Sequence, residues 1–374
     1  MNIGPKYEKG YELGYSLPEY VDEGIEYFLN IQFRLNRTLP WADRGHLVAV
    51  SQFKLPIQQR DGEIIKLGGM PKVKLEENEH SAVIKGNNFE ITFDKVSGTI
   101  SRYKYNGAEL ISKGLAETFW RAPTNNDIGG LAQKWIKEGL DRTVRRISGI
   151  EIQSVEEQAA KIVVKTVIAA YNAKPMFDVE TMYTIYGTGD IVVRAAFMPR
   201  RELPPLPRLG FRMHMPPGYE YMDWYGRGPH ESYEDKKESA LVGVYGGTVD
   251  EQFEPYIFPQ ENGNKSDVRW ASITDVNGLG LVFVGMPLIN FSAHHYTAEE
   301  LTRAKHLHEL NRTDETVINI DYKQGGLGSA SCGPDVLEKY RLKAEETVFN
   351  FRITPFSKNS FSQMQLSRRR LEKV

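Results

Sequence analysis

The chain has 374 residues, of which 40% are hydrophobic and 26% are charged, an ordinary balance for a globular protein. Its formal net charge of -2 excludes a global electrostatic attraction to nucleic acid or to an anionic membrane. The single cysteine, Cys332, excludes an internal disulfide and a metal site built on cysteines. No run of about 18 apolar residues is present that could span a membrane.

The start of the chain predicts part of a β domain. Residues 1–17 are polar and rich in turn formers, and we expect an irregular N-terminal segment there. Alternating apolar residues predict strands over 25–35 and 46–55. Two or three strands cannot form a stable sheet domain alone, so residues 18–56 are interpreted as part of a larger domain. The N-terminus has no apolar core of a signal peptide, which favours the cytoplasm. A periplasmic or secreted location stays open if a longer chain precedes it.

Residues 57–78 are rich in glycine and charge and are interpreted as a linker. From residue 79 to 356 the pattern predicts an antiparallel β architecture, in which only 131–140 and 297–304 read as helices. A (β/α)8 barrel needs about 250 residues of regular strand–helix alternation, which this chain lacks. Residues 357–374 form a basic tail that we expect to be poorly ordered. The predicted strands cover 81–84, 89–94, 99–105, 161–171, 182–186, 191–198, 209–215, 280–284, 291–293, 316–322 and 347–354.

The block at 120–129 reads WRAPTNNDIG. Pro123 lacks a backbone donor and the Asn-Asn-Asp run favours turns, so a strand is excluded. Trp120 and Ile128 are costly to leave in water. These features predict a pinned, internally hydrogen-bonded loop.

Three further dense blocks follow at 224–235, 255–263 and 325–334. In the first of them Gly226 and Gly228 alternate with larger residues. Glycines in this spacing indicate special backbone angles or the close approach of another segment.

These four blocks, in this order, resemble the C-terminal β-sandwich domain of bacterial multi-domain β-galactosidases of the glycoside hydrolase family 2 type. The family pattern runs F-x-R-A-P-x-D-N-D-I-G, W-x-G-x-G-P-x-E-N-Y-x-D-R and P-Y-x-x-P-x-E-N-G, followed by a Gly-rich loop. Asn125 and Ser232 depart from it, where Asp and Asn are common. The resemblance covers residues 18–355. It implies a mainly β fold, namely a large antiparallel β-supersandwich (galactose-mutarotase-like) preceded by a partial immunoglobulin-like domain.

The resemblance implies that the chain is the C-terminal portion or small subunit of a β-galactosidase, an enzyme that hydrolyses terminal β-D-galactosides such as lactose. Its partners would be the barrel-bearing portion or large subunit and the galactoside substrate. In the family both catalytic carboxylates and the Mg²⁺ site lie on the barrel, so we expect no catalytic residue and no cofactor in this chain, and no activity alone. Neither nucleic acid nor a membrane is expected as a partner, and self-association stays open.

The same resemblance sorts the motif residues into two groups. Close to the substrate we expect Asn126, Asp127, Gly129 and Cys332. At the position that Cys332 takes, the best-known members carry a tryptophan that stacks on the sugar beyond the scissile bond, and cysteine offers no such face. The residues expected to be structural are Trp120, Arg121, Pro123, Trp224, Gly226, Gly228, Glu231, Glu261 and Asn262.

Several features admit a catalytic or binding interpretation and a plainer one. Glu231 and Glu261 could form a carboxylate pair, but we expect them to cap turns or to pair with Arg121, Arg227 or Arg269. A histidine metal site usually needs three or four convergent ligands, and we therefore predict none from His294, His295, His306 and His308. Tyr225, Tyr233 and Tyr256 could stack on sugars, although core packing is more common. A stand-alone carbohydrate-binding module is the alternative function.

Overall fold

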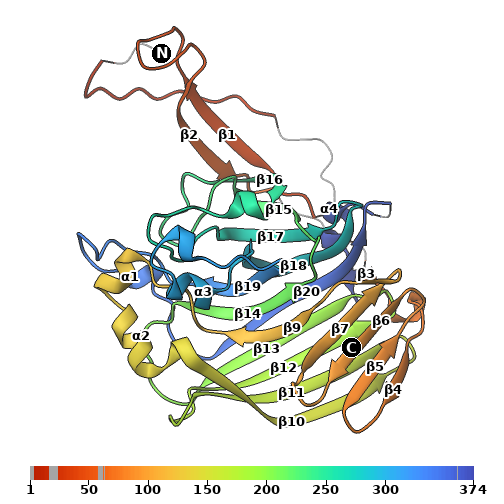
Figure 1. Cartoon of the computed structure of the whole chain (residues 1–374). Coiled ribbons are helices and arrows are strands. Elements are labelled where there is room, and N and C mark those ends of the chain that lie inside the picture. Colours follow the sequence, from red (N-terminus) through yellow and green to blue (C-terminus); the bar gives the residue numbers. More distant parts are fainter. Residues whose placement is uncertain (1–3, 17–23, 58–61, 63, 360) are drawn as a thin grey trace. The chain divides into compact units, whose positions relative to one another are not determined.

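A computed structural model describes residues 4–16, 24–57, 62, 64–359 and 361–374. The chain divides into two compact units, Met1–Glu63 and Ile64–Val374. Figure 1 shows the helices and strands of both units. Among the described residues, every helix is too short or too polar to cross a membrane.

Among its described residues, the first unit contains one antiparallel hairpin, made of β1 (Phe28–Arg34) and β2 (Leu47–Lys54). Both strands confirm the prediction from sequence. The described part of the predicted irregular segment, residues 4–16, has no helix or strand, and residues 17–23 lie outside the described residues. On the hairpin, Phe33, Val48 and Phe53 are 48%, 55% and 52% exposed, so these three apolar side chains are only partly covered.

A twelve-stranded antiparallel sheet forms most of the second unit (Figure 1). Its main path runs β10-β11-β12-β13-β20-β18-β17-β15-β16, and β19 joins β14 and β9 to β18. The strands are β9 (Lys113–Thr118), β10 (Thr143–Val155), β11 (Ala159–Ala170), β12 (Phe177–Tyr186), β13 (Ile191–Pro199), β14 (Arg208–Met215), β15 (Tyr221–Gly228), β16 (Leu241–Thr248), β17 (Lys265–Thr274), β18 (Leu279–His294), β19 (Thr316–Gln324) and β20 (Thr347–Ser357).

A five-stranded sheet packs against this large sheet. Buried and half-buried residues alternate along its strands β5 and β6, which gives it one core-facing side. Phe93 from the small sheet meets Tyr183 of β12, with ring centroids 6.1 Å apart. Tyr103 donates a 2.6 Å hydrogen bond to the Gly189 carbonyl. The mainly β, antiparallel sandwich predicted from sequence is therefore confirmed. The strands are β4 (Lys74–Glu77), β5 (Ser81–Lys85), β6 (Phe89–Asp94), β7 (Thr99–Tyr105) and β8 (Ala108–Glu109).

Helices are short. Both predicted helices are confirmed, as α2 (Ala132–Glu138) and α3 (Ala298–Arg303). The Thr297 hydroxyl accepts the Glu300 amide at the start of α3, as the capping pattern predicts. Two helices were not predicted, α1 (Asn125–Gly129) and α4 (Gln363–Arg368).

The structure corrects the predicted linker at 57–78. Its described part contains β3 (Ile64–Ile65) and all of β4, and Leu67 and Met70 are buried. Residues 58–61 and 63 lie outside the described residues. The sandwich unit therefore begins upstream of residue 79, because β4 is a full member of the five-stranded sheet.

The tail at 357–374 was predicted to be poorly ordered, and this is wrong. Leu366 on α4 is buried in a cluster with Trp270, Val282 and Phe356. Beyond α4, β21 (Arg370–Leu371) pairs in parallel with β3. The weak helical pattern of the tail understated its order because the apolar partners of Leu366 are distant in sequence.

Candidate functional site

One hollow of about 450 Å³ is lined by all four sequence blocks. We call it the motif hollow. Segments separated by more than 200 residues contribute to it, so only the folded chain creates it. Its lining residues are Thr124, Asn125, Asn126, Glu231, Asp235, Lys236, Tyr256, Gln260, Glu261, Leu327, Gly328 and Ser331.

The first block is held by a buried ion pair. Nη2 of Arg121 lies 2.7 Å from the Asp127 carboxylate, and the two side chains are 1% and 2% exposed. Burial opposes the charge, but Asp127 raises the pKa of Arg121, so the guanidinium stays charged. Asp127 also accepts the Thr124 amide, while the Thr124 hydroxyl accepts the Asp127 amide, which forms a capping box for α1. The predicted pinned, hydrogen-bonded block is confirmed, and its core is a short helix.

The two apolar ends of this block behave differently. Trp120 is buried and its indole donates a 3.1 Å hydrogen bond to the Thr302 hydroxyl. Ile128 is 48% exposed, so the prediction that it anchors the block is wrong. The anchoring comes instead from Arg121, which also donates to the carbonyls of Gly325 and Gly326.

Asn126 and Asp235 fix the Gly-rich fourth block. The Asn126 amide donates to the Gly328 carbonyl at 2.8 Å and its oxygen accepts the Ser331 hydroxyl at 2.6 Å. The Asp235 carboxylate accepts the amides of Leu327 and Gly328 at 2.8 and 2.7 Å. The loop is thereby tied to the first and second blocks by side chains that themselves line the hollow.

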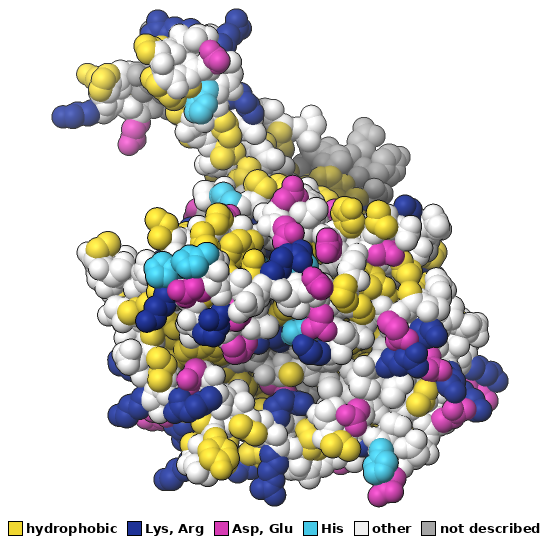
Figure 2. All heavy atoms as spheres, in the orientation of Figure 1, with side chains coloured by type: hydrophobic (Ala, Val, Ile, Leu, Met, Phe, Trp, Pro, Cys, Tyr) yellow, Lys and Arg dark blue, Asp and Glu magenta, His cyan; other side chains and the backbone are white. Residues whose placement is uncertain are grey.

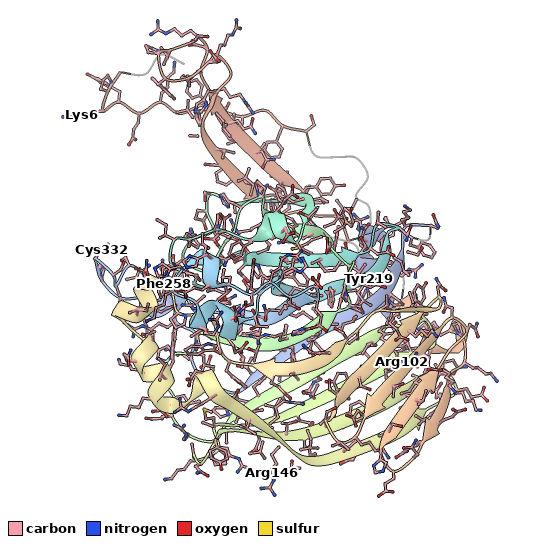
Figure 3. The ribbon with its side chains drawn as sticks, viewed as in Figure 1. Lys6, Arg102, Arg146, Tyr219, Phe258 and Cys332 are labelled. Carbon is pink, nitrogen blue, oxygen red and sulfur yellow. The ribbon has the colours of Figure 1, made fainter. Side chains whose placement is uncertain are left out.

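Of the four residues predicted to lie near the substrate, only Asn126 lines the hollow. Asp127 is buried beneath it. A Cβ on Gly129 would lie 2.6 Å from the Ala330 carbonyl oxygen, so Gly129 permits the close approach of the fourth block. Cys332 is exposed at the outer end of that loop, beside α1 (Figure 3).

Glu231 joins the second block to the third. Its Oε1 accepts the Lys236 ammonium at 2.6 Å and the Tyr256 hydroxyl at 2.5 Å, and its Oε2 accepts the Gly263 amide at 2.9 Å. Burial opposes ionisation, but the hydrogen bonds from Lys236 and Tyr256 lower the pKa of Glu231. The side chain is therefore an ionised anchor, and the partner is Lys236, not one of the arginines expected from sequence.

Glu261 is held in a second buried network. Its Oε1 lies 3.3 Å from Nη2 of Arg208 and accepts a hydrogen bond from the side-chain amide of Gln324 at 3.0 Å. Nε of the same arginine lies 2.9 Å from the Asp321 carboxylate. The expectation of an ion pair is met, although with Arg208. The neighbouring Asn262 accepts the Glu254 amide at 3.0 Å and stabilises the turn of the third block.

The second block includes strand β15, which lies very close to neighbouring strands at two glycines. The Trp224 indole donates to the Arg227 carbonyl at 3.0 Å within β15. A Cβ on Gly226 would lie 2.9 Å from the Cα of Val268, and one on Gly228 would lie 2.6 Å from the Tyr245 ring. The prediction of close approach at both glycines is confirmed. Pro123 is half-buried immediately before the α1 cap.

The three tyrosines have different positions. Tyr233 is buried, so sugar stacking is excluded for it. Tyr225 is half-buried and packs with the apolar cluster below α4, with Arg269 over its ring. Tyr256 lines the motif hollow and is 36% exposed. Sequence reasoning did not single out Asp235, Lys236, Gln260 and Ser331, although all four lie within or beside the blocks.

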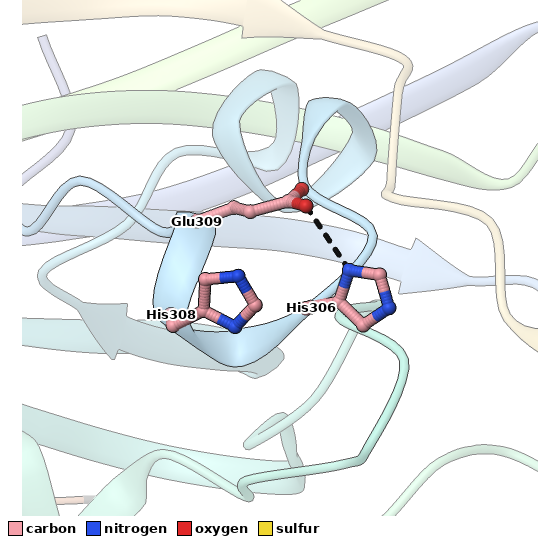
Figure 4. Close-up of side chains that lie close together, drawn as sticks. All are labelled: His306, His308 and Glu309. Carbon is pink, nitrogen blue, oxygen red and sulfur yellow. Dashed lines mark hydrogen bonds and ion pairs between the residues drawn. The ribbon is translucent and has the colours of Figure 1, made fainter.

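The four histidines fall into two sets. His294 is buried at the end of β18 and bonds the Asn262 carbonyl at 2.9 Å, and His295 bonds the Glu315 carbonyl at 3.0 Å. His306 and His308 lie in an exposed turn together with Glu309 (Figure 4). Glu309 is a ligand candidate that the sequence reading did not consider.

A larger hollow of about 850 Å³ lies between the outer face of the large sheet and the tail. It is lined by residues such as Met182, Arg194, Asn350 and Ser367, and by none from the four blocks. The motif hollow is therefore the better candidate site.

Comparison with known proteins identifies the family of the chain. Residues 85–353 match the family model described as "Beta galactosidase small chain", and residues 1–56 match "Beta-galactosidase, domain 4". A β-galactosidase from Priestia megaterium is 32% identical over 332 residues, which are 88% of this chain and 31% of that protein. One from Lactobacillus delbrueckii subsp. bulgaricus is 34% identical over 335 residues, which are 88% of this chain and 32% of that protein.

The chain therefore spans about a third of the length of these curated relatives. Among solved structures, a putative aldose 1-epimerase from Escherichia coli is similar with a TM-score of 0.40 and 8% identity, over 76% of this chain and 99% of that one. The small-chain family model covers most of the chain, including all four blocks. The chain belongs to the β-galactosidase family, of which it represents the small-chain portion.

Proposed function

We propose that this chain is the C-terminal portion or small subunit of a β-galactosidase that hydrolyses terminal β-D-galactosides, and that the motif hollow forms part of the wall of its active site. The observation that carries the proposal is the convergence of all four blocks on one polar hollow. A surface that a second portion of the enzyme recognises is expected to bring several sequence blocks together in this way. Family membership and the third of the relatives' length that the chain spans support it.

Glu231 and Glu261, the two carboxylates considered as a catalytic pair, do not suit the chemistry of a retaining glycosidase. That mechanism needs two carboxyl groups about 5–5.5 Å apart, one of which is a proton donor. Glu231 has a lowered pKa and three hydrogen-bond donors, and Glu261 is bound to Arg208 and Gln324. Both catalytic carboxylates are therefore expected from a barrel-bearing portion, and we expect no turnover from this chain alone.

The lining carboxylates do not suit Mg²⁺ either. This ion takes oxygen ligands in octahedral geometry. Glu231, Glu261 and Asp235 already accept hydrogen bonds or ion pairs from protein groups. The Mg²⁺ of the family is accordingly expected on the barrel-bearing portion.

The hollow can instead contribute polar contacts and an aromatic face. Asn125, Gln260 and Ser331 are hydrogen-bonding groups of the lining, and Tyr256 is its partly exposed aromatic ring. Sugar hydroxyls bind amides and hydroxyls, and sugar C–H faces pack on aromatic rings. In this arrangement Tyr256, not Cys332, offers the stacking surface.

The hairpin of the first unit supports a partner as well. An isolated two-stranded hairpin is at best marginally stable in water. Phe33, Val48 and Phe53 are about half-exposed on β1 and β2. We propose that further strands of an immunoglobulin-like domain, supplied by the barrel-bearing portion, cover these side chains.

A complementation assay tests the proposal. The purified chain is mixed with the purified barrel-bearing polypeptide of the same enzyme, and nitrophenyl β-galactoside hydrolysis is measured for each part and for the mixture. Activity in the mixture alone is expected, and Asn126→Ala should reduce it because the fourth block loses three hydrogen bonds. Turnover by the isolated chain, or a mixture without activity, would overturn the proposal.

The polar lining around Tyr256 also favours a second candidate, a stand-alone carbohydrate-binding module. Titration of the isolated chain with galactose and with lactose separates the two. Saturable binding without a partner, abolished by Tyr256→Ala, would support the binding module. Its absence, combined with activity in the mixture, would support the subunit.

A further inference from the structure

Three metal-ligand side chains converge in the turn that follows α3. His306, His308 and Glu309 each offer one ligand atom, and these atoms all lie within 4.8 Å of one another. A short 3-10 turn at Leu307–Glu309 brings the second and third side chains onto the same side as His306 (Figure 4). Figure 2 shows histidine side chains gathered on the surface near α3.

The local structure positions the carboxylate before any ligand arrives. Oε2 of Glu309 accepts the Lys305 amide at 2.8 Å, and its Oε1 accepts His306 Nδ1 at 3.0 Å. The Glu309 carbonyl accepts the Arg303 guanidinium at 2.6 Å.

The two imidazoles are also aligned. Their ring centroids are 5.4 Å apart and the ring planes differ by 16°. Both histidines are exposed, so their side chains can rotate without disturbing the core. The guanidinium of the neighbouring Arg303 is paired with Glu300 at 2.6 Å.

We propose that His306, His308 and Glu309 form a surface binding site for a divalent transition-metal ion of the zinc type, with water completing the coordination. Zinc lies about 2.0–2.2 Å from nitrogen and oxygen ligands, so tetrahedral ligand atoms are about 3.4 Å apart. Modest rotation of the exposed side chains closes the present spacing to this value. Imidazole ligands favour zinc, copper and nickel, whereas Mg²⁺ and Ca²⁺ prefer oxygen ligands.

The inference does not depend on the proposed galactosidase role. None of these three residues lines the motif hollow. The site also differs from the pair His294 and His295, whose ring nitrogens bond to the backbone carbonyls of Asn262 and Glu315. The sequence predicted no metal site from the four histidines, whereas the structure brings Glu309 together with two of them.

Calorimetric titration of the untagged, chelator-treated full chain with Zn²⁺ tests the site. We expect one ion per chain with micromolar affinity, at least tenfold weaker binding for His306→Ala, His308→Ala and Glu309→Gln, and no competition from millimolar Mg²⁺. The matched control is His80→Ala, an exposed histidine in another turn, which should bind like the unaltered chain.

A second readout separates binding from folding. Co²⁺ should give the visible absorption of a four-coordinate site in the unaltered chain and lose it in His308→Ala. Urea midpoints without metal should agree among all variants, because the altered side chains are at the surface. Unchanged Zn²⁺ affinity in both histidine variants, or an equal loss in the His80 control, would overturn the proposal.

Discussion

The buried ion pair beneath the motif hollow allows a quantitative test. We predict that Asp127→Asn, which keeps the shape of the side chain but removes its charge, strongly destabilises the sandwich. The change leaves the Arg121 guanidinium, 1% exposed, without its carboxylate. An uncompensated buried charge of this kind costs about 3–5 kcal/mol. The remaining acceptors are the carbonyls of Pro207, Gly325 and Gly326, so a value near 3 kcal/mol is expected.

A surface ion pair of the same length is the control. Asp178 lies 2.7 Å from the Arg200 guanidinium, as Asp127 does from Arg121, but these two side chains are 37% and 47% exposed. Exposed pairs contribute about 0–1 kcal/mol, so Asp178→Asn should change little. The two pairs share their charges and closest distance, but Asp127 also differs in its second bond to Arg121 and in the bond that it accepts from the Thr124 amide.

Urea unfolding followed by tryptophan fluorescence and circular dichroism gives both free energies. A double variant, Arg121→Met with Asp127→Leu, should recover part of the loss, since it leaves no buried charge. If Asp127→Asn costs no more than Asp178→Asn, or if the double variant is no more stable than Asp127→Asn, the reasoning about the buried charge is refuted.

Three further predictions concern the tail, a close strand contact and a buried cation. Leu366→Ala should destabilise the chain by about 2 kcal/mol because the side chain is 4% exposed. The control Leu337→Ala, at a 58% exposed site, should cost under about 0.5 kcal/mol in the same urea assay. Equal losses of stability in the two variants would contradict a packed tail. Gly226→Ala should cost about 1–3 kcal/mol, since its Cβ would meet the backbone of β17 at 2.9 Å, and Gly149→Ala, whose nearest contact is 3.8 Å away, should be nearly neutral. Burial lowers the pKa of Lys265 to about 8, below its unfolded value of 10.5. The unfolded chain therefore binds more protons between these values and stability rises with pH in that window; Lys265→Met should remove this rise, about 2 kcal/mol between pH 7.5 and 10, and identical pH profiles would contradict it.

Much of the sheet could be predicted because alternation is a local property. Strands β6 and β13 have buried residues at every second position, and the apolar pattern identifies them directly. Strand β15 was missed because it contains glycines that disfavour strands. Gly226 is required by Val268 of β17, about 40 residues away, and Gly228 by Tyr245 of β16, so the reason for the sequence lies in contacts that no local pattern contains.

The candidate site divides in the same way. The four blocks were recognisable by their composition and order, but the partners of their charged residues were not. Glu231 binds Lys236 and Tyr256, and Glu261 binds Arg208. Ion-pair partners depend on which side chains the strand register brings within about 4 Å, and several arginines were equally plausible from the sequence.

The sequence by itself determined the mainly β architecture, the helices α2 and α3, the family and the absence of a barrel pattern. Alternation, helical spacing, capping and motif order indicate these features, and all four are local patterns along the chain. Tertiary structure alone decided that the four blocks share one hollow and that the tail packs on the sandwich. The physical reason is the same for each. These features depend on the spatial convergence of side chains, which strand pairing and turn geometry establish only in the folded chain.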